Sequence, residues 1–166
     1  MKIYIDADGC PVVRNTLKIA GKFNIPCVII CDTAHQIEHD GAKTIVVDKC
    51  ADSVDFRLVN LIQQGDIAIT QDYGLAAMCL SKRAIVINQD GKEYTNDNIS
   101  GLLEFRAVSK KIRQNGGRLK GISKRTGEQD MAFENALRCM LLQQFHFRLI
   151  IAACRKPMVN IFSCNS

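Results

Sequence analysis

Short apolar runs, separated by longer amphipathic stretches, recur along the first ninety or so residues of the chain. The runs contain almost no polar residues, so each predicted strand is expected to be covered on both faces. Strands that alternate with helices in this way form parallel sheets between layers of helices. The pattern therefore predicts an α/β fold, a three-layer α/β/α arrangement around a mainly parallel sheet. The predicted strands are residues 3–6, 26–30, 44–47, 67–70 and 84–88.

Turn and capping residues set the limits of the predicted helices and add a small hairpin. Gly65 ends one helix, and Asp90-Gly91 predicts a hairpin turn at the end of the sheet. Thr95 has the side chain of a helix cap. The hairpin strand is predicted at residues 93–95, and helices at 11–23, 52–63, 75–80, 98–114 and from residue 129 onward.

Four aspartates are expected at one edge of this sheet. Asp6 ends the first strand, Asp8 follows it, and Asp72 follows the fourth strand. Asp55 lies one turn into the helix after the third strand, whose amino end is at the same edge. Open α/β sheets bind ligands outside the carboxyl ends of their strands. Asp66 begins the fourth strand, so it belongs to the opposite edge and is expected to serve as a turn or cap residue.

Carboxylates gathered in this way predict a site for a divalent cation. They repel one another, and a bound cation relieves that repulsion. Ligand sets made only of oxygen favour Mg²⁺ or Mn²⁺ over Zn²⁺. The residues leave a second interpretation open, in which the aspartates are turn and helix-cap residues that complement helix dipoles.

Composition places the chain among ordinary globular proteins. It has 166 residues, of which 47% are hydrophobic and 23% are charged. No apolar run approaches the roughly 20 residues of a membrane helix. The first residues form a strand that carries acids instead of a basic, apolar leader, so a cytoplasmic location is expected. The eight cysteines form no C-x-x-C pair and are expected to be reduced thiols.

The formal net charge of +5 conceals an asymmetry along the chain. Residues 1–80 carry ten acids against seven Lys and Arg, a net −3, whereas residues 81–166 carry seven against fifteen, a net +8. The stretch 106–125 contains eight of these cations and no acid. An acidic, metal-binding edge beside a basic flank is suited to a polyanionic substrate, although a solvated basic helix and loop would give the same pattern.

Several motifs together resemble the YaiI/YqxD family of uncharacterised bacterial proteins. The resemblance covers residues 1–142 and implies a PIN-like fold, whose members are typically metal-dependent nucleases. It implies metal-binding or catalytic roles for Asp6, Asp55 and Asp72, with Asp8 as a family-specific addition. Residues 143–166 are predicted to be an atypical C-terminal tail that packs as a helix or mediates association of subunits, as in a homo-oligomer. The motifs are residues 6–11, 52–55, 65–76 and 91–99, with Arg113, Gly116, Asp130 and Phe133.

The leading hypothesis is therefore a metal-dependent phosphodiesterase, with RNA as the expected substrate. Asp6, Asp8, Asp55 and Asp72 would be its catalytic and metal-binding residues. The expected substrate-binding residues are Thr70, Lys110, Lys111, Arg113, Arg118, Lys120, Lys124 and Arg125.

Three other interpretations stay open. The first strand and its two acids also resemble the first motif of haloacid-dehalogenase-type phosphatases, in which the first aspartate is a nucleophile and Thr70 would be the hydroxyl motif. Alternatively, the acids are structural and the basic stretch binds nucleic acid without catalysis. Finally, His35 and His39 have the H-x-x-E-H spacing of some zinc peptidases, but a loop is the expected structure there.

Overall fold

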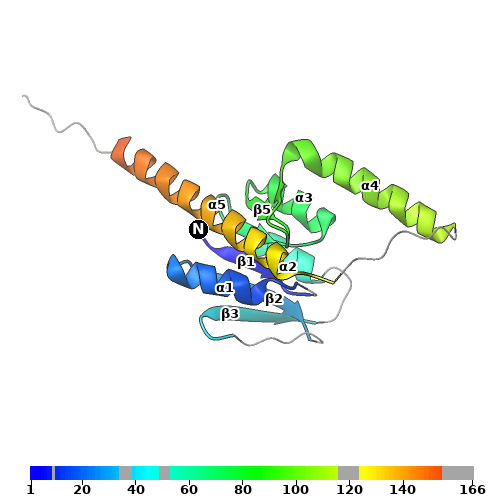
Figure 1. Ribbon diagram of the computed structural model, residues 1–166, viewed down its shortest axis with the longest axis horizontal. Helices are drawn as coiled ribbons and strands as arrows, with labels where there is room; N and C mark the ends of the chain where they lie inside the picture. Colours follow the sequence, from blue (N-terminus) through cyan, green and yellow to red (C-terminus); the bar gives the residue numbers. More distant parts are fainter. Residues whose placement is uncertain (9, 34–38, 49–52, 116–123, 155–166) are drawn as a thin grey trace, which may run out of the picture.

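A computed structural model describes residues 1–8, 10–33, 39–48, 53–115 and 124–154 of the chain (Figure 1). The predicted elements are present, and their ends differ from the prediction by no more than two residues. The strands are β1 (Ile3–Asp6), β2 (Cys27–Asp32), β3 (Ala42–Val47), β4 (Ile67–Ile69), β5 (Ile85–Ile87) and β6 (Glu93–Tyr94). The helices are α1 (Val13–Lys22), α2 (Ser53–Leu61), α3 (Tyr73–Ser81), α4 (Asn96–Gln114) and α5 (Gly127–Cys154).

The strands form one six-stranded sheet in the order β3-β2-β1-β4-β5-β6. All neighbouring strands are parallel except β5 and β6, which form the predicted antiparallel hairpin. In the centre of the sheet, Ile5 of β1 lies between Ile29 of β2 and Ile69 of β4. This register brings the carboxyl ends of β1 and β4 side by side at one edge of the sheet.

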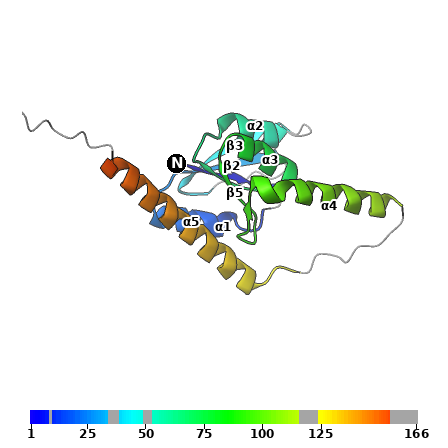
Figure 2. The same ribbon diagram turned by 90° about the horizontal axis from the view of Figure 1, so that it is seen from above.

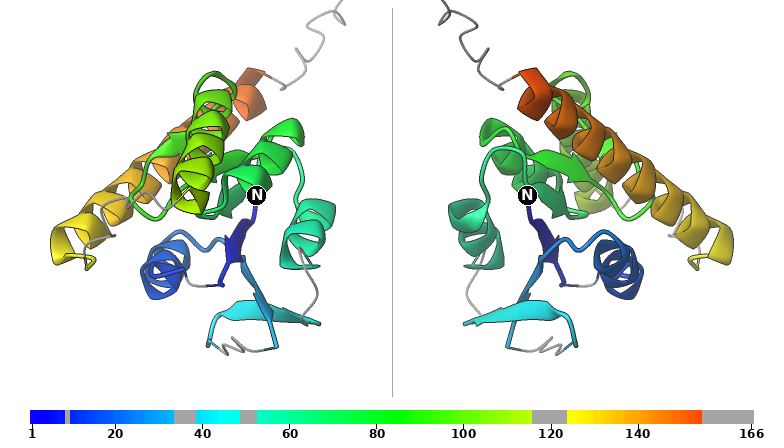
Figure 3. Two further views of the ribbon diagram at one scale, coloured as in Figure 1. Left: turned by 90° about the vertical axis from the view of Figure 1, so that its right-hand side faces the viewer. Right: turned by 90° about the vertical axis from the view of Figure 1, so that its left-hand side faces the viewer.

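Helices cover both faces of the sheet, as the apolar strands predicted (Figures 2 and 3). Ile3 and Ile5 pack in one core with residues of α1 and with Phe133 and Leu137 of α5. Tyr4 points to the other face, where α2, α3 and the start of α4 complete a second core. The fold is therefore the predicted three-layer α/β/α arrangement. Asp6 and Thr70 follow the parity of Tyr4 and Ala68, which puts them on the face covered by α2, α3 and α4.

Most of α4 extends beyond the sheet (Figure 1). Only Ile99 and Ser109 of this helix are buried. Several of its apolar side chains are exposed, among them Phe105 and Val108. A single helix, α5, runs through residues 142 and 143, where a domain boundary was predicted. Residues 155–166 of the predicted tail lie outside the described residues, and subunit association through this tail stays a prediction.

Two further observations bear on the sequence-based expectations. No helix in the described residues is both long enough and apolar enough to span a membrane. Five cysteines in the described part of the chain form no disulfide there: Cys10, Cys27, Cys31, Cys79 and Cys139.

Candidate functional site at the carboxyl edge of the sheet

Asp6 and Thr70 join β1 to β4 at the carboxyl edge. The Thr70 hydroxyl donates a hydrogen bond to Asp6 Oδ2 over 2.7 Å. The same hydroxyl oxygen accepts a bond from the backbone N–H of Asp72 over 3.0 Å. Thr70 is fully buried, so these contacts fix its rotamer and hold the Asp6 carboxylate in one orientation. The hydroxyl expected to contact substrate is thus occupied by the Asp6 carboxylate.

Asp72 is the N-cap of α3, as a turn-and-cap interpretation predicts. Its Oδ1 accepts hydrogen bonds from the backbone N–H groups of Gly74 and Leu75, over 2.6 and 3.1 Å. Its other oxygen, Oδ2, accepts a bond from Arg106 Nη1 of α4 over 2.7 Å. Capping therefore occupies one oxygen only, and the second faces a cation.

The environments of Asp6 and Asp72 shift their pKa values in opposite directions. Burial raises the pKa of Asp6, with smaller increases from the charges of Asp8 and Asp72, against the lowering effect of the Thr70 hydrogen bond. Burial also opposes ionisation of Asp72, but the hydrogen bonds from Arg106, Leu75 and Gly74 outweigh it and lower its pKa. The charge that is least well compensated at this edge is therefore that of Asp6.

Asp8 and Asp55 flank this pair. The strand ends at Asp6, so strict alternation does not place Asp8, whose Oδ1 instead accepts a bond from the backbone N–H of Asp32 in β2 over 3.2 Å. Asp55 lies in the first turn of α2. Burial, followed by the charges of Asp55 and Asp6, raises the pKa of the Cys79 thiol to about 12. The charges of Asp8 and Asp72 thus both act on Asp6, and the charges of Asp55 and Asp6 both act on Cys79.

The described residues contain no group of three or more His, Cys, Asp or Glu side chains close enough to hold a metal ion. The donor chemistry nevertheless fits a hard cation, because the Asp6 carboxylate is half-buried beside the negative charges of Asp8 and Asp72. A cation bound at Asp72 Oδ2 would share that oxygen with the guanidinium of Arg106 or displace it. The arrangement is thus an acidic edge partly neutralised by one arginine.

The structure describes five of the seven predicted substrate-binding cations, and these five differ in exposure. The exposed ones include Lys110, Lys111 and Arg113 of α4, and Lys124. Arg125 is different, because its guanidinium donates to Asp130 over 2.6 Å, to Asp90 over 3.0 Å and to two backbone carbonyls. It ties the turn after β5 to the start of α5. The remaining two, Arg118 and Lys120, lie outside the described residues.

Arg125→Ala is accordingly expected to act mainly on the stability of the protein and only secondarily on RNA binding. The substitution removes several charge-assisted hydrogen bonds from a side chain that is only 19% exposed, so we expect a loss of about 2 kcal/mol in the free energy of unfolding. Urea unfolding measures this loss. Lys124→Ala is the matched control, because its exposed side chain should change stability by less than about 0.5 kcal/mol. Equal stability of the two variants would contradict the structural role of Arg125.

Asp66 lies at the opposite edge, as predicted. It is 7% exposed, and its two oxygens accept bonds from the backbone N–H groups of Lys2 and Gln63, over 2.8 and 3.1 Å. The amino terminus of Met1 is 3.9 Å away. These contacts give Asp66 the turn and cap role expected from the sequence.

Asp66→Asn is expected to cost on the order of 1–2 kcal/mol of stability, since the amide can accept only one of the two backbone bonds in the same way. Its effect on cation binding or RNA cleavage should be less than twofold, because it is at the other end of the strands. Thermal unfolding and a cleavage assay on the same preparation test both statements. A loss of cleavage without unfolding would show that the two edges are coupled.

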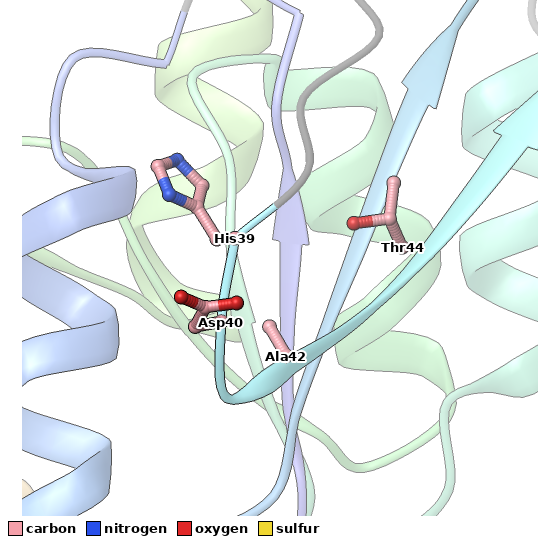
Figure 4. A pocket seen from close by; sticks show the side chains of 4 residues that line it. All are labelled: His39, Asp40, Ala42 and Thr44. Atoms are coloured by element: carbon pink, nitrogen blue, oxygen red, sulfur yellow. The ribbon is translucent and has the colours of Figure 1, made fainter.

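A pocket of about 640 Å³ lies beside the segment that leads into β3. It is at the amino end of β3, which is an edge strand of the sheet. His39, Asp40, Ala42 and Thr44 line it (Figure 4). His39 belongs to the H-x-x-E-H sequence, but His35 and Glu38 lie outside the described residues. The zinc interpretation therefore has one described ligand, and the pocket is at the end of β3 away from Asp6 and Asp72.

Arg106 is a site residue that the sequence did not single out from the other cations around it. It was counted in the basic stretch, but only the structure brings it to Asp72. A signal was present, because Arg106 and Arg113 are seven residues apart and share one face of a helix with Leu102. That stripe could have been read as a surface facing the acids.

The fold and this edge define a class: an α/β protein with a mainly parallel sheet and interacting carboxylates at its carboxyl end. Comparison with known sequences makes the assignment specific. Residues 4–143 match the family described as "Uncharacterized BCR, YaiI/YqxD family", and the chain belongs to this family. The resemblance found in the sequence is thus confirmed.

The curated relatives carry the name UPF0178 protein. That of Exiguobacterium sibiricum is 46% identical over 144 residues, which cover 87% of this chain and 99% of the relative. That of Ruminiclostridium cellulolyticum is 50% identical over 137 residues, covering 82% and 90%. That of Clostridium acetobutylicum is 44% identical over 145 residues, covering 86% and 98%. No solved structure matches the chain.

Proposed function

We propose that the carboxyl edge of the sheet is the active site of a divalent-metal-dependent phosphodiesterase that cleaves RNA. One observation carries the proposal. The half-buried Asp6 carboxylate is held by Thr70 in the presence of the negative charges of Asp8 and Asp72. Keeping an ionised carboxylate partly desolvated beside like charges is unfavourable for stability, and a divalent cation would offset that cost. The PIN-like resemblance supports the same chemistry.

Asp6 and Asp72 are the residues proposed to hold Mg²⁺ or Mn²⁺, with Asp8 and Asp55 contributing directly or through water. When bound, such a cation lowers the pKa of a coordinated water and stabilises negative charge on a phosphate. Thr70 orients the Asp6 carboxylate, since its hydroxyl is fixed between Asp6 and the Asp72 backbone.

The basic residues are proposed to attract the RNA backbone. Lys110, Lys111 and Arg113 lie on the exposed part of α4, which begins beside the acidic edge at Arg106. Cations gathered beside acids raise the local concentration of a polyanion and make its binding sensitive to salt. The basic helix then supplies affinity, and the acidic edge supplies the chemistry.

The test is cleavage of a labelled single-stranded RNA by the full chain, freed of contaminating nucleases. We expect cleavage with Mn²⁺ or Mg²⁺, its loss in EDTA, and its recovery when the metal is restored. Asp66→Asn should cleave within twofold of the unmodified protein. Cleavage that persists in EDTA would contradict the proposal. Salt-sensitive RNA binding with no cleavage in either metal would instead favour the non-catalytic nucleic-acid-binding module.

A further inference from the structure

A pocket of about 700 Å³ opens beside the acidic edge. The residue after Thr70, the turn between β5 and β6, and one face of α4 form its walls. Its volume is within the range of roughly 300–1,000 Å³ that is usual for small-molecule sites. Tyr73 adjoins Asp72 in the chain, and Arg106 contributes to the pocket while its guanidinium contacts Asp72. The pocket and the acidic edge are therefore contiguous.

Positive charge dominates the α4 wall of the pocket. Arg106 and Arg113 both line it, two helical turns apart. Arg113 forms no ion pair with any residue that the structure describes, although the pocket also has two acids. One of these acids, Asp90, is already paired with Arg125 over 3.0 Å, and the other, Glu93, is exposed. An anionic group is the ligand that this wall would bind.

Besides the two arginines, the pocket combines apolar surface with an unused hydrogen-bond acceptor. Tyr73 and Leu102 provide the apolar surface, and the Tyr73 ring packs edge-on against Tyr94 with centroids 5.8 Å apart. Gln89 Nε2 donates to Asp90 over 3.3 Å. Gln89 Oε1, by contrast, is a buried acceptor with no hydrogen-bond partner among the described residues. A buried acceptor without a donor is costly, and a turn of the Gln89 side chain toward the pocket would let a ligand N–H group satisfy it.

From these features we infer that the pocket binds one unpaired nucleotide of a single-stranded RNA. The base would lie against Tyr73 and Leu102 and donate an N–H to Gln89 Oε1. Its phosphate would lie between Arg106 and Arg113. A base stacked inside a duplex cannot enter such a pocket, so the substrate class is single-stranded. This inference rests on the proposed function, because it selects the strand that reaches the acidic edge.

The test measures binding in EDTA, where the proposed metal-dependent cleavage does not occur. The binding result therefore does not depend on whether the proposed cleavage chemistry is correct. Adenosine 5′-monophosphate and inorganic phosphate are titrated separately into the full-length protein and followed by amide chemical shifts. A labelled single-stranded RNA and the corresponding duplex are compared by fluorescence anisotropy. We expect the mononucleotide to shift the amides around Tyr73 and Gln89, and the single strand to bind at least about tenfold more tightly than the duplex.

Three variants locate the binding groups. Arg113→Gln should weaken binding of the mononucleotide and of phosphate by about tenfold, as expected for loss of a charge-assisted contact. Gln89→Leu should weaken the mononucleotide and leave phosphate unchanged. Arg138→Gln removes an exposed cation from α5, outside the pocket, and should change both by less than twofold. Equal binding of single strand and duplex, or no effect of Arg113→Gln and Gln89→Leu, would overturn the inference.

Discussion

Asp6→Asn is expected to abolish Mn²⁺-dependent RNA cleavage, by about 1,000-fold or more, and at the same time to stabilise the metal-free protein. The loss follows because several kcal/mol of transition-state stabilisation depend on the cation that Asp6 is proposed to hold. The gain follows because the substitution removes a half-buried charge that lies beside the charges of Asp8 and Asp72. The amide oxygen can still accept the Thr70 hydrogen bond, so the local structure should be retained.

The pH dependence of this gain has a definite sign. Burial raises the pKa of Asp6 above its ordinary value of 3.8, so the native state binds more protons than the unfolded state between the two pKa values. Stability of the unmodified protein therefore falls as pH rises through that window. The difference in melting temperature between Asp6→Asn and the unmodified protein should be positive at pH 7 and shrink as the pH is lowered below that window. A variant that is inactive and also less stable at pH 7 would point to a structural role for Asp6.

Asp72→Asn is expected to reduce RNA cleavage strongly and, unlike Asp6→Asn, to lower the stability of the protein. Cleavage should fall about 100-fold, because a charged ligand becomes a neutral one that keeps a single oxygen. Asparagine caps helices about as well as aspartate, so the start of α3 should be preserved. The variant loses the pair with Arg106, which is worth about 1 kcal/mol or less because both partners are partly exposed.

The pKa of Asp72 sets the pH window for that loss. Burial alone would raise this pKa, but the hydrogen bonds from Arg106 and the α3 backbone lower it, so the ionised carboxylate stabilises the folded protein above its ordinary pKa. This contribution is lost as the pH falls through the lowered value. Asp72→Asn should thus be slightly less stable than the unmodified protein at pH 7 and similar to it in strong acid. Thermal unfolding at several pH values measures both windows. Higher stability of Asp72→Asn at pH 7 would contradict this assignment.

The sheet could be predicted because its signals are local. Runs such as residues 27–31 are apolar throughout, and this alone implies coverage on both faces and a parallel sheet. Asp66 precedes β4 and Asp72 follows it. The length of one strand was therefore enough to assign the two aspartates to opposite edges of the sheet. The cap role of Asp72 was one of the two interpretations that the sequence left open, and the structure shows that a cap uses only Oδ1.

What the sequence missed depends on contacts between distant segments. Arg106 and Asp72 are 34 residues apart, so no local sequence pattern predicts their contact. The contact depends on where α4 packs against α3. Arg125 has the same composition signal as its neighbour Lys124, yet its contacts with Asp90 and Asp130 fix it within the protein. Charge and spacing identify the residue types, whereas the fold decides which are paired.

Calorimetric titration of Mn²⁺ into the metal-free protein is the most direct test of the cation site at the carboxyl edge. The site described above predicts saturable binding by the unmodified protein and by Asp66→Asn, and none by Asp6→Asn at the same concentrations. Absence of binding by the unmodified protein at millimolar Mn²⁺, or binding by Asp6→Asn as tight as that of the unmodified protein, would contradict it.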